Sequence, residues 1–143
     1  LLSQNLPFLN TKVNEYLSLL KLPHVVWFTD ELTTKITLND REFAFSSISN
    51  GQIARINIAL CLAFRDVLTR QHANINLLML DECLDVGLSS NGITNALRML
   101  RTKAKDDNLK MLVITHRDEI SSLPFDKRIK VMFQDNFSTA QVE

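Results

Sequence analysis

Apolar residues recur along this chain at spacings that predict three helices. Steps of three and four residues indicate an amphipathic helix over residues 2–22, ended by Pro23, and another helix over residues 91–105. Between them, residues 52–69 contain too many apolar positions for a single stripe, which is typical of a helix buried on most sides. We therefore expect the middle helix to lie at the centre of the core.

Short segments rich in β-branched and aromatic residues predict antiparallel strands in two parts of the chain. A small meander is expected from residues 25–28, 33–38 and 42–45. Near the C-terminus, residues 129–133 and 137–142 predict a hairpin that closes the fold.

Two further strands end at residues that could carry chemistry. Residues 77–80 form a continuous apolar run, typical of a central strand covered on both faces of its sheet. Residues 110–115 form a second apolar strand. We expect an α/β fold in which helices flank a mixed sheet.

Composition fits a single globular domain and restricts the classes of function. Of 143 residues, 45% are hydrophobic and 22% charged, which suffices for one compact core. Sixteen basic and sixteen acidic residues cancel, so no whole-chain field attracts nucleic acid or anionic membranes. Any DNA contact must be local or supplied by a partner. No apolar stretch approaches the ~20 residues that cross a bilayer, so no membrane partner is expected.

The cysteines and the first residue bear on location and completeness. Cys61 and Cys83 form no CxxC unit, which predicts reduced thiols and a cytoplasmic protein. The chain begins with Leu1 rather than methionine, and this favours a fragment of a longer protein.

Asp81 and Glu82 follow directly after the first apolar strand. A carboxylate at a strand tip can hold a hydrated magnesium ion while its neighbour polarises an attacking water. Acids at the carboxyl end of a strand also lie where α/β sheets place their chemistry. The alternative is a plain turn at the end of the strand.

A polar loop, residues 46–52, leads into the long buried helix. Ser49 can cap that helix, and the exposed amides at the positive end of its dipole would suit a phosphate. The alternative is an ordinary helix cap, with Asn50 and Gly51 as turn residues. At the end of the second apolar strand, His116 could reach a terminal phosphate, although a structural histidine is the alternative.

One glycine pattern is misleading. Residues 87–94 have the GxxxxGK[ST] spacing of a phosphate-binding loop, but Ile93 stands where the lysine belongs. Without that cation the segment cannot serve as a Walker A motif, and no other glycine of the chain can start one.

Taken in order, these segments resemble the C-terminal half of ABC-type ATPases. Residues 48–52, Ile-Ser-Asn-Gly-Gln, are similar to the LSGGQ signature loop. Residues 77–82 resemble a Walker B strand, residues 85–89 a D-loop region, and His116 a switch histidine. The closest resemblance is to the SMC-like ATPase subunit of recombination and repair nucleases, especially the large subunit of phage recombination endonucleases.

The resemblance implies a role for each matching residue. Asp81 would hold Mg²⁺, Glu82 would be the general base, and His116 would sense the γ-phosphate of ATP. The residues expected to bind the ATP of a second head are Ser49, Asn50, Gly51, Gln52 and the D-loop residue Ser89. Asn50 replaces a glycine and Ser89 replaces the usual aspartate, and these departures bear on the rate more than on the fold.

The resemblance also implies a domain organisation and partners. Residues 1–22 would be a helix at the base of a coiled-coil arm, and residues 23–143 the C-terminal half of an ABC/SMC-type head of the P-loop NTPase class. The expected partners are the N-terminal lobe of the same head, a second head in a homodimer, a metal-dependent exonuclease subunit, and DNA through the assembled complex. Alone the chain would be inactive, and a phage-encoded protein would work in the host cytoplasm.

Two other functions fit the same segments. A non-catalytic module for dimerisation or DNA clamping could keep an ABC-like core, and the two departures favour it. A fragment of an ABC transporter's nucleotide-binding domain shares the order of motifs, although the periodic helix before the meander favours the coiled-coil branch.

Overall fold

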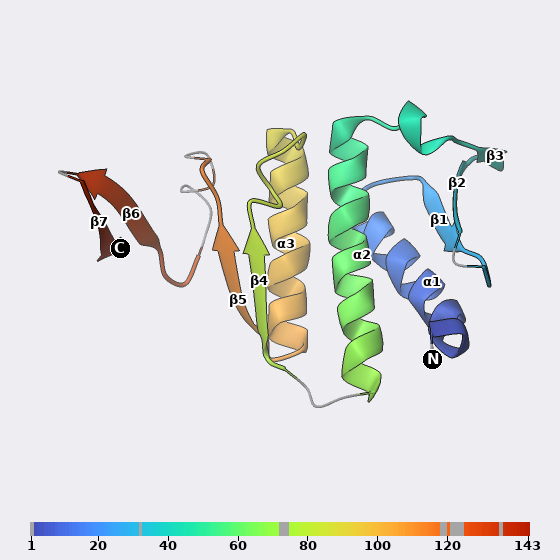
Figure 1. Ribbon diagram of the computed structural model, residues 1–143, viewed down its shortest axis with the longest axis horizontal. Coiled ribbons are helices and arrows are strands. Elements are labelled where there is room, and N and C mark those ends of the chain that lie inside the picture. The colour runs from blue at the N-terminus through green and yellow to red at the C-terminus, as the bar shows by residue number, and fades with distance from the viewer. Residues whose placement is uncertain (1, 32, 72–74, 118–119, 121–124, 135) are drawn as a thin grey trace.

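The computed structural model describes residues 2–31, 33–71, 75–117, 120, 125–134 and 136–143. Three helices occupy its centre: α1 (Leu2–Leu19), α2 (Asn50–Gln71) and α3 (Ser90–Asp106). In Figure 1, α2 stands between α1 and α3, and strands lie on both flanks of this helical layer. The three predicted helices are therefore confirmed, and none of the described helices is long and apolar enough to span a membrane.

In the described part of the chain, the strands form three separate sheets. The meander contains β1 (Val25–Phe28), β2 (Thr34–Leu38) and β3 (Arg41–Glu42). Beside α3, β4 (Leu77–Asp81) pairs in parallel with β5 (Lys110–Ile114). The antiparallel hairpin contains β6 (Ile129–Gln134) and β7 (Phe137–Val142). This arrangement confirms the predicted α/β class, with helices flanking the sheets.

Two predicted boundaries are wrong. The first helix stops at Leu19, because Lys21 adopts a φ of 57° and Leu22 N–H donates to Leu17 O at 2.9 Å. This is the pairing of a Schellman motif, which ends the helix before Pro23 is reached. The third strand includes only Arg41–Glu42, because the chain then turns into a short 3₁₀ helix, η1 (Phe45–Ser47), that leads toward α2.

The predicted burial of β4 and α2 is also wrong in part. Leu80 of β4 is buried and Leu78 packs against the core, but Leu77 and Met79 are exposed. Successive side chains of a strand point to opposite faces, so this sheet is covered by helices on one face and bare on the other among the described residues. On α2, Phe64 and Leu68 are likewise exposed.

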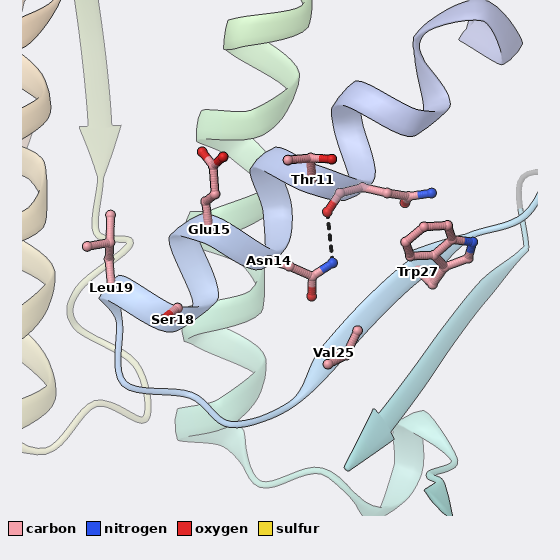
Figure 2. Close-up of a pocket in the computed structure, with 8 residues that line it drawn as sticks. Thr11, Asn14, Glu15, Ser18, Leu19, Val25 and Trp27 are labelled. Carbon is pink, nitrogen blue, oxygen red and sulfur yellow. Dashed lines mark hydrogen bonds between the residues drawn. The ribbon is translucent and has the colours of Figure 1, made fainter. Parts of the chain in front are cut away.

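The helix α1 is fastened to the edge of the meander by two asparagines. Asn10 donates to Phe28 O at 3.0 Å and accepts from Phe28 N–H at 2.9 Å. One turn later, Asn14 donates to Val26 O at 2.8 Å and accepts from Val26 N–H at 3.0 Å. Figure 2 shows Asn14 lying between α1 and β1. The two amides take the place of a neighbouring strand, so the edge of β1 is closed to further pairing.

A buried polar network connects all three helices. Tyr16 Oη donates to Asp66 at 2.5 Å, and Lys103 Nζ lies 2.7 Å from the other oxygen of Asp66. Lys103 also pairs with Asp107, which Arg65 contacts at 3.0 Å. Burial raises the pKa of Tyr16 to about 12, and the hydrogen bond to Asp66 adds to this effect. Burial by itself would lower the pKa of Lys103, but its hydrogen bonds with Asp66, Tyr16 and Asp107 outweigh burial and raise it.

Replacing Asn10 tests the closed strand edge. Asn10→Leu keeps a side chain of similar size but leaves Phe28 N–H and C=O without their partner. Each buried unsatisfied group costs about 1–3 kcal/mol, so the free energy of unfolding should fall by roughly 2 kcal/mol or more. Denaturant unfolding measures this, with Ser18→Ala on the exposed face of the same helix as the control. Equal stability of the two variants would contradict the role assigned to Asn10.

The raised pKa of Tyr16 predicts a loss of stability in alkali. The phenol is protonated in the folded state up to a pKa of about 12, but only up to about 10 in the unfolded chain. Its contribution is therefore complete below pH 10 and is lost as the pH rises from 10 to 12. Unfolding measured across this interval should lose about 1–3 kcal/mol from this group, and less in Tyr16→Phe. Identical pH dependence in both proteins would argue against the network.

Candidate active site

The two strands of the parallel sheet bring separate parts of the sequence to one edge. In the register of β4 and β5, Asp81 lies opposite Ile114, so the residues after each strand emerge side by side. Glu82 N–H donates to Ile114 O at 2.9 Å, which extends the ladder by one residue. Glu82 then adopts a φ of 51°, and this left-handed conformation turns the chain back at the strand end.

Glu82 and His116 meet at this edge. The distance between Glu82 Oε1 and His116 Nε2 is 2.6 Å. The side chains are 54% and 77% exposed, respectively, so a substrate and water can reach both of them. A carboxylate and an imidazole in contact can hold a shared proton and can orient each other for proton transfer.

Asp85 ties the backbone of this edge together. Its carboxylate accepts a hydrogen bond from Thr115 Oγ1 at 2.5 Å and another from His116 N–H at 2.7 Å. Its own N–H donates to Glu82 O at 3.0 Å. One residue is therefore bonded to the segments that carry both members of the Glu82–His116 pair.

Arg117 holds the same loop from the β5 side. Its guanidinium donates to Asp85 O through Nε at 3.1 Å and through Nη2 at 2.8 Å, and to Leu88 O through Nη1 at 3.1 Å. The positive charge is used to bind backbone carbonyls of the loop, which leaves the Asp85 carboxylate to Thr115 and His116.

The polar loop before α2 has the predicted helix cap. Ser49 N–H donates to Gln52 Oε1 at 2.9 Å, and Gln52 N–H is 3.4 Å from Ser49 Oγ. This reciprocal pair is a capping box, so the Gln52 side chain is occupied by the cap. A similar device starts α3, where Ser89 Oγ accepts from Gly92 N–H at 3.3 Å.

Two glycines bring the capped loop against the loop after β4. A Cβ atom on Gly51 would lie 2.5 Å from Gly87 O, and one on Gly87 would lie 2.8 Å from the carbonyl carbon of Asn50. Gly87 also has a φ of 74°, which other residues rarely adopt. The space left by the missing side chain of Gly51 is filled by backbone, so this is a packing role that the sequence did not indicate.

A cavity of about 300 Å³ joins the two loops, and its lining includes Asn50, Cys61, Leu80, Glu82 and Cys83. The structure thus places Asn50 and Glu82 around one space. Both cysteines are free thiols in this structure. Burial, with a smaller effect from Cys83, raises the pKa of Cys61, so its thiol stays protonated at neutral pH. A larger groove of about 720 Å³ lies between α1 and β1, and Figure 2 shows its lining, which contains none of the predicted site residues.

Asp81 is an exposed carboxylate beside Glu82. Among the residues that the structure describes, no three histidine, cysteine or acidic side chains gather as a metal cluster. A single carboxylate of this kind could take one position around Mg²⁺, which is usually held by one or two carboxylates together with water and substrate phosphates.

Sequence reasoning located the acidic pair and the histidine but missed the groups that hold them. Asp85 was only part of a loop region, and Thr115 and Arg117 were only neighbours of His116. Their role depends on pairing between segments about 30 residues apart, which no local pattern reveals. A weak signal was present, because a charged residue that follows a strand tip is often used at that edge of the sheet.

Comparison with known proteins supports the resemblance. No protein-family model matches the sequence. The chain is 32% identical over 120 residues to exonuclease subunit 2 of Escherichia phage RB69, and 28% identical over 120 residues to exonuclease subunit 2 of Enterobacteria phage T4. Each match covers 82% of this chain but 21% of the relative, so the chain spans about a fifth of the length of those proteins.

Solved structures of SMC proteins share the fold. A structure described under ATP-driven dimerisation and DNA-stimulated activation of SMC ATPases matches with a TM-score of 0.79 at 16% identity, over 98% of this chain and 86% of that chain. The SMC head domain from Thermotoga maritima matches with a TM-score of 0.68 at 21% identity, over 98% of this chain and 49% of that chain. This chain is homologous to the phage exonuclease subunit 2 proteins and has the fold of an SMC ATPase head, of which the C-terminal lobe is the part that fits.

Proposed function

We propose that this chain is the C-terminal lobe of a head that binds and hydrolyses ATP. The supporting observation is the meeting of Glu82 and His116, 2.6 Å apart, at the carboxyl edge of a parallel sheet. Sheets of this type bind their ligands at that edge. The homologous phage proteins and the SMC ATPase fold favour ATP as the ligand.

The proposed roles follow from the chemistry of each side chain. Glu82 accepts a proton from the attacking water, and His116 orients the Glu82 carboxylate and senses the terminal phosphate. Asp81 takes one position in the coordination of Mg²⁺. ATP bound with Mg²⁺ supplies the phosphoryl group and a stabilised leaving group, and the residues of this chain position the water and remove its proton.

The capped loop before α2 is proposed to face the ATP of a second head in a homodimer. Its helix is 22 residues long, and the positive end of the dipole lies at Asn50. Ser49 keeps a hydroxyl proton for a phosphate oxygen while its oxygen caps the helix. Gly51 and Gln52 would contact this ATP through the backbone of the loop. Ser89 would approach it from the loop after β4.

The second half of the site is proposed to come from the N-terminal lobe of the same head. This chain has no lysine at the lysine position of a GxxxxGK[ST] motif, so the phosphate-binding loop must be supplied by another segment. Among the described residues, one face of the β4–β5 sheet is apolar and exposed, and a surface of this kind marks an interaction site. This face is evidence for such a neighbouring lobe. It contains the exposed side chains of Leu77, Met79, Leu112 and Ile114.

The same proposal divides the chain into two parts. Residues 1–22 lie at the base of a coiled-coil arm, and residues 23–143 form the C-terminal half of the head. The relatives are named as exonuclease subunits, which favours work on DNA in recombination or repair with a metal-dependent nuclease partner. Such a phage-encoded complex would act in the host cytoplasm.

A non-catalytic dimerisation or DNA-clamping module is the second candidate. The observation that favours it is the use of Ser89 as the cap of α3, at a position that the resembling D-loop usually fills with aspartate. Asn50 at a position usually held by glycine points the same way. The two candidates differ in whether the assembled head turns over ATP.

Magnesium-dependent ATP hydrolysis by the chain alone, and by the chain combined with its N-terminal lobe, tests the proposal. We expect hydrolysis only in the combination. Glu82→Gln should lower kcat by about 100-fold or more, because removal of a general base typically costs 10²–10⁴. Glu31→Gln, at an exposed position in the meander, is the matched control and should leave kcat unchanged. No turnover in the combination, together with a stable dimer, would support the non-catalytic module instead.

A further inference from the structure

The contact between the Glu82 and His116 side chains is too weak to hold the two residues in place by itself. Both are more than half exposed, and a contact between exposed side chains contributes little energy even when both are charged. The 2.6 Å contact therefore depends on where the backbone holds the two residues. Catalytic groups need such support, since a misplacement of about 1 Å can cost 10²-fold in rate.

The backbone of the pair is held through one residue. Asp85 is half-buried, and its carboxylate bonds to Thr115 Oγ1 at 2.5 Å and to His116 N–H at 2.7 Å. Its N–H bonds to Glu82 O at 3.0 Å. No other described residue is bonded in this way to the backbone of both Glu82 and His116.

Arg117 and Thr115 complete this arrangement. Arg117 fixes the loop by three hydrogen bonds to the carbonyl groups of Asp85 and Leu88. Its own N–H donates to Thr115 Oγ1 at 3.1 Å, so the threonine hydroxyl joins Asp85 to the strand tip. On the other side of the loop, the close approach of Gly87 to Gly51 prevents the loop from moving toward α2.

We propose that Asp85, acting with Thr115 and Arg117, is a positioning residue that holds His116 in contact with Glu82 during hydrolysis. None of the three is expected to touch the substrate, since the side-chain atoms involved are bonded to the protein. This inference rests on the proposed ATPase function. It adds that turnover requires a carboxylate at residue 85, although the residue lies outside the predicted site.

The test measures kcat and KM for ATP in the assembled head. Asp85→Ala should lower kcat by about ten- to hundredfold with little change in KM, because binding is unaffected while the pair is misplaced. Asp85→Asn keeps one acceptor for His116 N–H and should recover part of the loss. Asp106→Asn, an exposed aspartate at the end of α3, is the matched control and should match the unmodified head.

A double-mutant cycle separates positioning from a general structural effect. If Asp85 acts through His116, then Asp85→Ala should have almost no further effect on kcat once His116→Ala has been made. A merely structural role would lower kcat by the same factor in both backgrounds. The thermal midpoint is measured for each variant. Should Asp85→Ala fail to fold, Thr115→Val and Thr115→Ser are compared instead. Only serine keeps the hydroxyl that bonds to Asp85, so kcat should fall in Thr115→Val and be largely kept in Thr115→Ser.

The outcomes distinguish this inference from the proposed function. Turnover that is lost in Glu82→Gln but kept in both Asp85→Ala and Thr115→Val would overturn the positioning role alone. Equal losses with and without His116 would also overturn it. If the assembled head shows no turnover that depends on Glu82, both the ATPase proposal and this inference fail.

Discussion

The parallel pairing of β4 with β5 creates the edge at which Glu82 and His116 meet. Each strand is followed by polar residues, and only a parallel register puts both of these segments at the same edge. The crossover through α3 makes that register possible and covers one face of the pair. Had the strands run antiparallel, Glu82 and His116 would lie at opposite ends of the sheet.

The helical side of the molecule serves a different purpose, which is to join α1 rigidly to the core. Asn10 and Asn14 close the edge of β1, and Tyr16 reaches the Asp66–Lys103 pair between α2 and α3. These contacts are mostly polar and partly or fully buried, so their removal leaves unpaired groups rather than small cavities. These contacts therefore hold α1 against the meander and against α2 and α3.

Much of the fold could be predicted from periodicity, because each helix and strand has its pattern in the local sequence. The helices, the hairpin and both apolar strands were expected near their observed positions. Burial was harder to predict. The apolar run 77–80 predicted a strand covered on both faces, but Leu77 and Met79 are exposed. A run of apolar residues shows which side chains favour burial and does not show what packs against them. The end of the first helix was also missed, since the Schellman bonds at Lys21 and Leu22 depend on backbone conformation rather than on a residue preference.

The residue types at the strand ends and before α2 can be read directly from the sequence, and they define the chemistry that is possible: two carboxylates, an imidazole and a capped loop. Which of these groups meet depends on how distant segments pack together. Glu82 and His116 are 34 residues apart, and Asp85 and Thr115 are 30 apart. Contacts over such separations arise from strand pairing and helix crossover, whose free energy belongs to the whole core. For the same reason, the role of Asp85 and the contact between Gly51 and Gly87 became visible only in three dimensions.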